Sequence, residues 1–190
     1  VWRRQLAAVA GRLLDSANNG GAGGGDPQST AVAVGFADLA GYTSLSRQIE
    51  VGELSAVLEE FEALAADLVA EHRGQVVKTI GDEVLFVADT AVAAAEIALE
   101  LQRLAGPRLP PLRIGLAYGS VLARFGDVYG PVVNLASRLT GLARVGTVLI
   151  DQQLAAELAG DARFELRRLR PASVRGYHHL NPVRLRAAGG

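Results

Sequence analysis

The segment Val76–Val87 reads VVKTIGDEVLFV and sets the order of the elements around it. Two apolar runs flank Gly81-Asp82, and this spacing predicts a β-hairpin with Asp82 at its tip, although Gly-Asp is less favoured in such turns than Asp-Gly. The segment also contains Lys78, the only lysine of the 190 residues, whereas the other 18 basic residues are arginine. A compact ammonium group in place of the wider guanidinium fork indicates a small acceptor in a tight place.

A strand and a long helix are predicted before this hairpin. The apolar run AVAVGF (31–36) is typical of a strand, and it ends at Asp38. Apolar residues then repeat every three or four positions over 54–69, which predicts a helix. Gly74 stands where a C-terminal capping glycine is expected. The order of elements up to the hairpin is therefore strand, helix, strand.

Further helices and strands follow the hairpin. Asp89 is expected to cap a helix that ends at Gln102 or Leu104, and LRIGLAYG and VLARF are predicted as the next strands. A helix is expected from about Pro131 to Ala143. The remainder is predicted as strand TVLI, helix DQQLAAELA and strands FELRRLR, SVRGYHHL and PVRLRA. This interleaving predicts an α/β (α+β) domain with a mixed sheet and helices on one side.

Composition limits the function classes. With 49% hydrophobic and 21% charged residues, the chain fits one globular domain with a sizeable core. The formal net charge of -1 gives no basic field, so no nucleic-acid partner is expected. The absence of cysteine excludes disulfides and thiolate metal sites. No run approaches ~20 apolar residues, so we expect no membrane contact from this chain and a cytoplasmic location.

The N-terminal part differs in composition from the rest. Residues 1–17 have helical spacing with arginines around an apolar side, and the glycine-rich stretch NNGGAGGGDP follows. The predicted division is therefore a helix and linker over 1–30 and a folded domain over 31–187. An upstream regulatory domain, with signal input through this helix, is left open.

Two aspartates are candidate metal ligands. Asp38 follows one apolar strand and Asp82 lies at the tip of another, so the two carboxylates reach the same edge of the sheet if these strands are neighbours. Mg²⁺ takes one or two carboxylates together with phosphate oxygens, and the amides of Ala40, Gly41 and Tyr42 are candidates to hold the anion. The alternative is that Asp38 caps a helix and Asp82 is an ordinary turn residue. Spacing alone leaves both interpretations open.

A second polar group lies on the predicted helix PVVNLASRLTGLA. Asn134 and Arg138 are four residues apart and therefore share one helix face, while apolar residues supply the buried side. An amide beside a guanidinium group suits a phosphate during transfer, and Asp127 adds a carboxylate just before the helix. The alternative is a solvated polar stripe.

Four blocks together resemble a known family. FADLAGYT, VKTIGDEVLF, GDVYGPVVNLASRL and VRGY resemble, in order and spacing, the catalytic domain of class III nucleotide cyclases, in the style of bacterial, mycobacterial-type adenylate cyclases. The resemblance covers about residues 31–185. It implies a ferredoxin-like βαββαβ core with additional strands. It also implies conversion of ATP to 3′,5′-cyclic AMP and pyrophosphate with two divalent ions, Mg²⁺ or Mn²⁺.

The resemblance also implies a role for each matching residue. The implied metal ligands are Asp38, Asp82 and the Leu39 carbonyl; the adenine-reading pair is Lys78 and Asp127; the transition-state pair is Asn134 and Arg138; the remaining substrate-binding residues are Ala40, Gly41, Tyr42, Thr43 and Arg175. The family usually has lysine at the position of Arg175; arginine also pairs with phosphate, and bidentately, but its length and fork differ from those of an ammonium group. The other arginines of the C-terminal strands are interpreted as a solvated sheet face without a function.

The implied assembly is a head-to-tail homodimer with two shared sites. One chain supplies Asp38 and Asp82, and the other supplies the adenine-reading and transition-state pairs. Three rival functions stay open: a guanylate cyclase, a non-catalytic nucleotide-binding or dimerisation module of the same fold, and an enzyme like polymerase palms or diguanylate cyclases. The paired Lys78 and Asp127 argue against the last.

Overall fold

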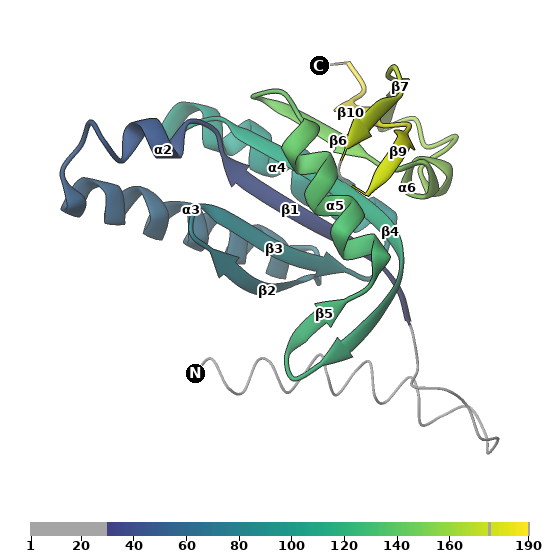
Figure 1. The fold of residues 1–190 in the computed structure, drawn as a ribbon, viewed down its shortest axis with the longest axis horizontal. Helices are drawn as coiled ribbons and strands as arrows, with labels where there is room; N and C mark the ends of the chain where they lie inside the picture. The colour runs from purple at the N-terminus through teal and green to yellow at the C-terminus, as the bar shows by residue number, and fades with distance from the viewer. Residues whose placement is uncertain (1–29, 175, 190) are drawn as a thin grey trace.

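The structure, a computed structural model, describes residues 30–174 and 176–189. Its centre is an eight-stranded sheet in which β2-β3-β1-β4-β6-β10-β7 are neighbours and β5 pairs with β4; β8 and β9 form a separate pair (Figure 1). The strands are β1 (Thr30–Leu39), β2 (Gln75–Ile80), β3 (Glu83–Ala88), β4 (Leu112–Arg124), β5 (Asp127–Tyr129), β6 (Thr147–Ile150), β7 (Phe164–Arg168), β8 (Ala172–Val174), β9 (Tyr177–Leu180) and β10 (Val183–Ala187). The helices are α2 (Tyr42–Leu45), α3 (Val51–Glu71), α4 (Ala91–Arg108), α5 (Pro131–Leu142) and α6 (Gln152–Glu157). The predicted N-terminal helix and most of the linker lie outside the described residues.

The first four strands form the predicted ferredoxin-like core. Along the chain the order is β1, α3, β2, β3, α4, β4, and in the sheet β1 lies between β3 and β4, antiparallel to both. β2 completes the group on the outer side of β3. The prediction of this core with additional strands is therefore confirmed, and β6, β10 and β7 extend the sheet beyond β4.

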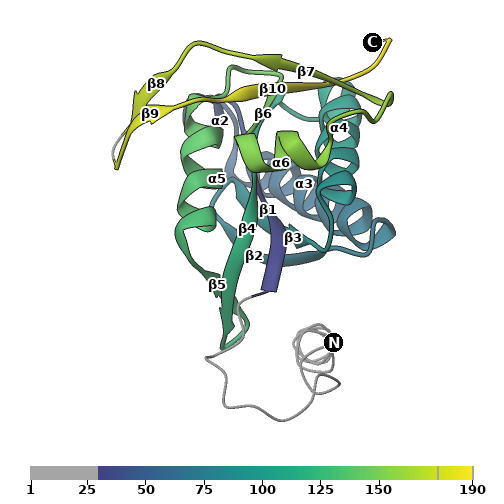
Figure 2. The ribbon, with the colours of Figure 1, turned by 90° about the vertical axis from the view of Figure 1, so that its right-hand side faces the viewer.

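Helices cover both faces of the sheet, so the prediction of helices on one side is wrong. α3, α4 and α6 pack through one buried cluster, while α5 packs through a second cluster on the opposite face (Figure 2). The reason is visible in β1, where residues 32–37 are all buried. A strand that is apolar on both faces needs cover on both faces.

One glycine sets the position of α5. A Cβ atom at Gly115 of β4 would lie 2.3 Å from the backbone nitrogen of Thr140 and 2.4 Å from the carbonyl oxygen of Ala136. The buried Thr140 hydroxyl donates to the Ala136 carbonyl at 3.0 Å. Only glycine permits this close approach of helix and strand. The contact fixes how α5 lies over the sheet.

Local details differ from the predictions at four places. The segment SVRGYHHL, predicted as one strand, contributes to two antiparallel strands, β8 and β9. Thr90 rather than Asp89 caps α4, because the Thr90 hydroxyl accepts from the Ala93 N–H, and the helix continues to Arg108. The two strands predicted at LRIGLAYG and VLARF are one continuous strand, β4. At the end of α3 the left-handed residue is Arg73, at φ 58°, rather than Gly74.

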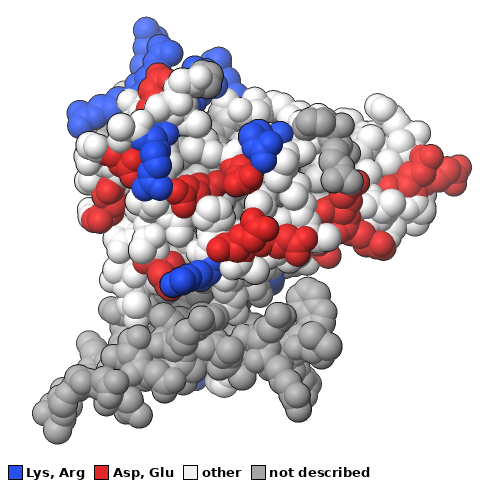
Figure 3. All heavy atoms as spheres, turned by 180° about the vertical axis from the view of Figure 1, so that it is seen from behind, with Lys and Arg blue, Asp and Glu red and all other residues white. Residues whose placement is uncertain are grey.

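The surface shows where charge gathers. On the face in Figure 3, acidic side chains cover the middle and one end, and arginines gather at the end where β7 and β10 lie. This face offers no continuous basic surface of the kind that binds nucleic acid. In the described part of the chain, no helix combines the length and apolar character needed to cross a membrane.

Candidate active site

Three carboxylates meet at one end of β1. Asp38 is the ninth residue of β1 and pairs in register with Glu83, the first residue of β3. Asp82 lies in the two-residue turn between β2 and β3, where Gly81 has φ 64°. The Leu39 N–H donates to the Asp82 carbonyl oxygen at 3.2 Å, which ties the turn to β1. The hairpin predicted from the sequence is confirmed, and Asp38 and Asp82 lie together as expected.

Burial and mutual repulsion disfavour the ionised forms of Asp38 and Glu83. Burial raises the pKa of Asp38 to about 6, and the negative charge of Asp82 and a hydrogen bond between the two carboxyl groups add to this, while Arg113 opposes it. Burial, with the charges of Asp38 and Asp82, raises the pKa of Glu83 to about 7. Negative charge is therefore concentrated in a half-buried place, and a bound cation would relieve it.

The donor set fits a hard divalent cation. Carboxylate oxygens are the ligands that Mg²⁺ and Mn²⁺ prefer, and Mg²⁺ usually takes only one or two of them together with water and phosphate oxygens. No cluster of three or more His, Cys, Asp or Glu with metal-binding geometry occurs among residues 30–174 and 176–189. Asp38 and Asp82, which lie together, match the one or two carboxylates that Mg²⁺ takes. The role of the Leu39 carbonyl stays a prediction.

Two residues of this site were missed in the sequence. Glu83 directly follows Asp82, and Arg113 pairs in register with Asp38 from the other side. The row Glu83–Asp38–Arg113 therefore crosses three neighbouring strands. The charge of Arg113 lowers the pKa of Asp38, and its guanidinium group could bind an anion held beside the carboxylates. Both residues could have been found only from the pairing register of the three strands, which the sequence alone does not give.

Replacing Glu83 with glutamine is expected to stabilise the metal-free protein at high pH. Because the folded-state pKa is raised from 4.5, the protonated Glu83 contributes stability below about pH 4.5, and this contribution is lost as pH rises through about 7. Allowing for its half-buried position, we expect E83Q to gain about 1 kcal/mol at pH 8 and nothing at pH 4.

Urea unfolding in EDTA at the two pH values measures this difference. E71Q, at the exposed end of α3, is the matched control and should change little at either pH. A Glu83 variant less stable than the wild type at pH 8 would contradict the electrostatic account.

The segment after Asp38 partly fits the predicted anion-binding role. The Ala40 N–H donates to the Pro111 carbonyl oxygen at 2.9 Å, so this amide is already used and the expectation for it does not hold in this structure. Gly41, at φ 80°, precedes the four-residue helix α2, which begins with Tyr42 and Thr43. The first N–H groups of a helix have no acceptor within it, so these amides remain candidates.

Lys78 and Asp127 lie in contact. The Lys78 Nζ donates to Asp127 Oδ2 at 2.5 Å, across 49 residues of sequence. The Lys78 hydrogen bond lowers the pKa of Asp127, as does the N–H of Val128. A register shift between Val76 and Lys78, typical of a β-bulge, precedes Lys78 on the outer strand β2. The lysine side chain is 43% exposed, so it is accessible rather than interior.

Asn134 and Arg138 are both exposed on α5. The buried side of this helix is formed by Val132, Ala136 and Leu139, which pack on the sheet. The predicted shared face for the amide and the guanidinium group is therefore present. Its catalytic role stays a prediction.

The end of the chain packs near the start of α5. The Tyr177 hydroxyl of β9 donates to the Pro131 carbonyl oxygen at 3.3 Å. This bond connects the VRGY block to the helix that carries Asn134 and Arg138. Arg175 lies outside the described residues, so its predicted role is not addressed by the structure.

The candidate residues form separate groups on one chain. The carboxylates lie where β1 ends near α2, whereas β5, which carries Asp127, lies at the opposite end of the sheet (Figure 1). The structure brings together Asp38 with Asp82, and Lys78 with Asp127. Within residues 30–174 and 176–189, no hydrogen bond or ion pair joins these two pairs.

The fold and the site define a class: a ferredoxin-like α+β domain with a pair of acidic metal-ligand candidates at a strand end. The family model described as the adenylate and guanylate cyclase catalytic domain matches residues 26–186. The chain therefore belongs to this family of nucleotide cyclase catalytic domains.

Relatives support the same assignment, and solved structures share the fold. The chain is 45% identical to a protein named adenylate cyclase from Glutamicibacter nicotianae over 100% of its own length, and 50% identical to one from Streptomyces coelicolor over 83%. It spans only 50% and 41% of those proteins. Among solved structures, a rhodopsin-guanylyl cyclase catalytic core with converted specificity, in complex with ATPαS, has TM-score 0.78 at 25% identity, covering 84% of this chain and 96% of that one. An adenylyl cyclase from P. aeruginosa has TM-score 0.73 at 21% identity, covering 83% and 94%.

Proposed function

We propose that this domain is an adenylate cyclase that converts ATP to 3′,5′-cyclic AMP and pyrophosphate. The observation that carries the proposal is the contact between Lys78 and Asp127, because a donor beside an acceptor matches the hydrogen-bonding edge of adenine. The names of the relatives from Glutamicibacter and Streptomyces support the same substrate.

Asp38 and Asp82 would hold two divalent ions, Mg²⁺ or Mn²⁺. Bound there, such ions lower the cost of forming the ribose 3′-oxyanion and offset phosphate charge. Arg113, beside Asp38, would bind a phosphate oxygen through its guanidinium fork. The amides of Gly41, Tyr42 and Thr43 would donate to the same triphosphate.

Lys78 and Asp127 would read the purine. Lys78 would donate to adenine N1, and Asp127 would accept from the exocyclic amine. Guanine presents a donor at N1 and an acceptor at O6, so both contacts would be opposed. Each frustrated contact costs roughly 1–3 kcal/mol, which together gives a strong preference for ATP.

Asn134 and Arg138 would act on the reacting atoms. Asn134 would orient the ribose, and Arg138 would donate to the charge that grows on the α-phosphoryl group as the 3′-oxygen attacks in line. Both side chains are exposed on α5, which leaves them accessible to a substrate.

The active unit would be a head-to-tail homodimer with two shared sites. Lys78 and Asp82 are four residues apart on one hairpin, yet one would read the base and the other would hold metal at the phosphates. One subunit would therefore give Asp38 and Asp82, and the other would give Lys78, Asp127 and the face of α5. Arg175 from that second subunit would reach the triphosphate.

The direct test is product formation from ATP and GTP with Mg²⁺ or Mn²⁺, measured by chromatography. Cyclic AMP as the dominant product supports the proposal. Dominant cyclic GMP would assign a guanylate cyclase instead, and nucleotide binding with no product under either metal would indicate a non-catalytic module.

Shared sites are tested by mixing two inactive variants. D38A lacks a metal ligand and N134A lacks the ribose contact, so a mixed dimer has one intact site. If chains assort at random, the mixture should recover about a quarter of wild-type activity. No recovery, with mixed dimers confirmed by mass spectrometry, would contradict shared sites.

Replacing Lys78 with alanine is expected to lower the preference for ATP over GTP, with little effect on the stability of the fold. Loss of the donor to N1 should lower kcat/KM for ATP by about 10- to 100-fold and leave the value for GTP nearly unchanged. T79A, the exposed neighbour on β2, is the control. Equal losses for ATP and GTP would indicate that Lys78 does not read the base.

A further inference from the structure

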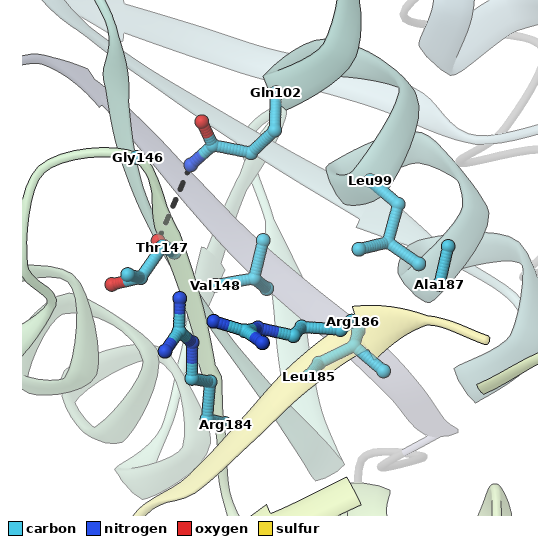
Figure 4. A pocket seen from close by; sticks show the side chains of 9 residues that line it. All are labelled: Leu99, Gln102, Gly146, Thr147, Val148, Arg184, Leu185, Arg186 and Ala187. Atoms are coloured by element: carbon cyan, nitrogen blue, oxygen red, sulfur yellow. Dashed lines mark hydrogen bonds between the residues drawn. The ribbon is translucent and has the colours of Figure 1, made fainter. Parts of the chain in front are cut away.

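A cavity of about 380 Å³ lies at the end of the β6–β10 pairing, under α4. Its walls are mostly apolar and include Leu99, Val148 and Leu185. Arg184 and Arg186 of β10 also line it, and Figure 4 shows both side chains running from β10 toward Thr147 of β6. The cavity thus combines an apolar wall with two guanidinium groups.

Positive charge around this cavity has little compensation. Burial lowers the pKa of Arg184, and the charges of Arg186, Arg167 and Arg144 lower it further, whereas Glu165 alone acts in the opposite direction. No ion pair to Arg184 or Arg186 occurs within the described ranges, although Arg163 nearby in sequence has acidic partners. Glu165, which pairs in register with Arg186 across β7 and β10, is thus one carboxylate beside four arginines, Arg144, Arg167, Arg184 and Arg186.

One donor of this cluster is also unsatisfied. The Nε atom of Arg184 is buried and has no hydrogen-bond partner among residues 30–174 and 176–189. A buried donor without an acceptor costs free energy, so it needs an explanation. A solvated sheet face, as the alternating arginines suggested in the sequence, does not account for a buried Nε.

We propose that this cavity binds a small organic anion, whose carboxylate or phosphate group is held by Arg184 and Arg186 and whose apolar part lies against Leu99, Val148 and Leu185. The guanidinium fork matches both oxyanions in two-point geometry. The volume lies in the range of small-ligand sites, which are mostly apolar with a few placed polar groups. The anion would meet the terminal nitrogens of the two guanidinium groups, since Arg184 Nε itself is buried.

This site is distinct from the candidate active site. Thr147 pairs with Arg113, and Arg113 pairs with Asp38, so the cavity lies two strands away from the carboxylates. Neighbouring strands are ~4.8 Å apart, which gives a separation of roughly 10 Å. The cavity uses none of the residues proposed to bind ATP.

Calorimetric titration of the full chain in EDTA tests the site. Phenyl phosphate and benzoate are the probes for the two oxyanions, benzyl alcohol is the neutral analogue, and inorganic phosphate lacks the apolar part. We expect saturable binding of at least one aromatic anion, no binding of benzyl alcohol, and at least about tenfold weaker binding of inorganic phosphate. Absence of saturable binding by both aromatic anions would overturn the proposal.

Variants assign the binding to the cavity. R186Q and R184M should each weaken binding about tenfold or more. R168Q, an exposed arginine on β7 that does not line the cavity, should bind like the wild type. Unchanged binding in R184M and R186Q, equal loss in R168Q, or displacement of the probe by a nonhydrolysable ATP analogue would each overturn it.

Thermal unfolding without ligand separates a binding role from a structural one. If Arg184 serves a ligand, R184M removes an unsatisfied buried donor and a repelling charge, and Tm should rise by ~2 °C or more. If Arg184 instead stabilises the fold, R184M should lower Tm, which counts against the proposal. The combination of higher Tm and lost anion binding is the expected result.

Discussion

Replacing Arg138 with alanine is expected to lower kcat for ATP about a thousandfold while leaving the fold intact. The reason is that Arg138 would meet negative charge that develops only in the transition state, and a placed arginine in phosphoryl transfer contributes ~10³ or more in rate. Its side chain is exposed on α5 and forms no hydrogen bond or ion pair in the described part of the chain, so its removal leaves no buried group unpaired. KM should change little, because ground-state binding rests on other residues.

Three measurements separate this role from a structural one. Tm of R138A should match the wild type, and kcat from steady-state kinetics should carry the loss. R138K keeps the charge without the planar fork and should recover only part of the rate. R103A, on α4 in an exposed pair with Glu100, is the matched control and should keep full activity. A loss confined to KM would indicate uniform binding instead.

Replacing Asp38 with asparagine is expected to lower turnover strongly and at the same time to stabilise the metal-free protein. Loss of one metal ligand removes several kcal/mol of transition-state stabilisation, so kcat should fall by about 10³-fold. Stability should move the other way, because the folded-state pKa of Asp38 is raised from 3.8 to about 6. Protonated Asp38 contributes stability below pH 3.8, and this is lost as pH rises through about 6, so the neutral asparagine is favoured above pH 6.

D38N is expected to lower kcat but to raise the free energy of unfolding, so the two measurements move in opposite directions. Unfolding in EDTA at pH 7.5 should show D38N above the wild type, and Mn²⁺ should stabilise the wild type but much less D38N. D67N, at an exposed position on α3, controls for removal of one negative charge. If D38N bound Mn²⁺ like the wild type, Asp38 would not be a metal ligand.

Local chemistry made part of the fold predictable. The Gly81-Asp82 turn, the helix from Pro131 and the strand that leads to Asp38 all follow from apolar spacing and turn residues; the structure has each of them, with the strand ending one residue later, at Leu39. The helix cap was misplaced by one residue, since Asp89 and Thr90 are both good caps and only the backbone geometry selects between them.

Part of the site also followed from the sequence. The positions of Asp38 and Asp82 at strand ends predicted that the two carboxylates lie together, and they do. The resemblance to the cyclase family predicted that Lys78 and Asp127 act as a pair, and their contact is compatible with this. Glu83 and Arg113 were missed because their place beside Asp38 depends on which residues face each other across three strands. Pairing register is a property of the assembled sheet and is not written in either strand alone.

The sequence by itself determined the elements, their order and the residue types at the site, because turns, helix periodicity and apolar runs act over a few neighbouring residues. Only the tertiary structure decided that α5 covers the second face of the sheet, that a third carboxylate crowds Asp38, and that arginines of β10 line a cavity with an unsatisfied donor. These features depend on burial and on charges brought close from distant positions, and both exist only after the chain has folded.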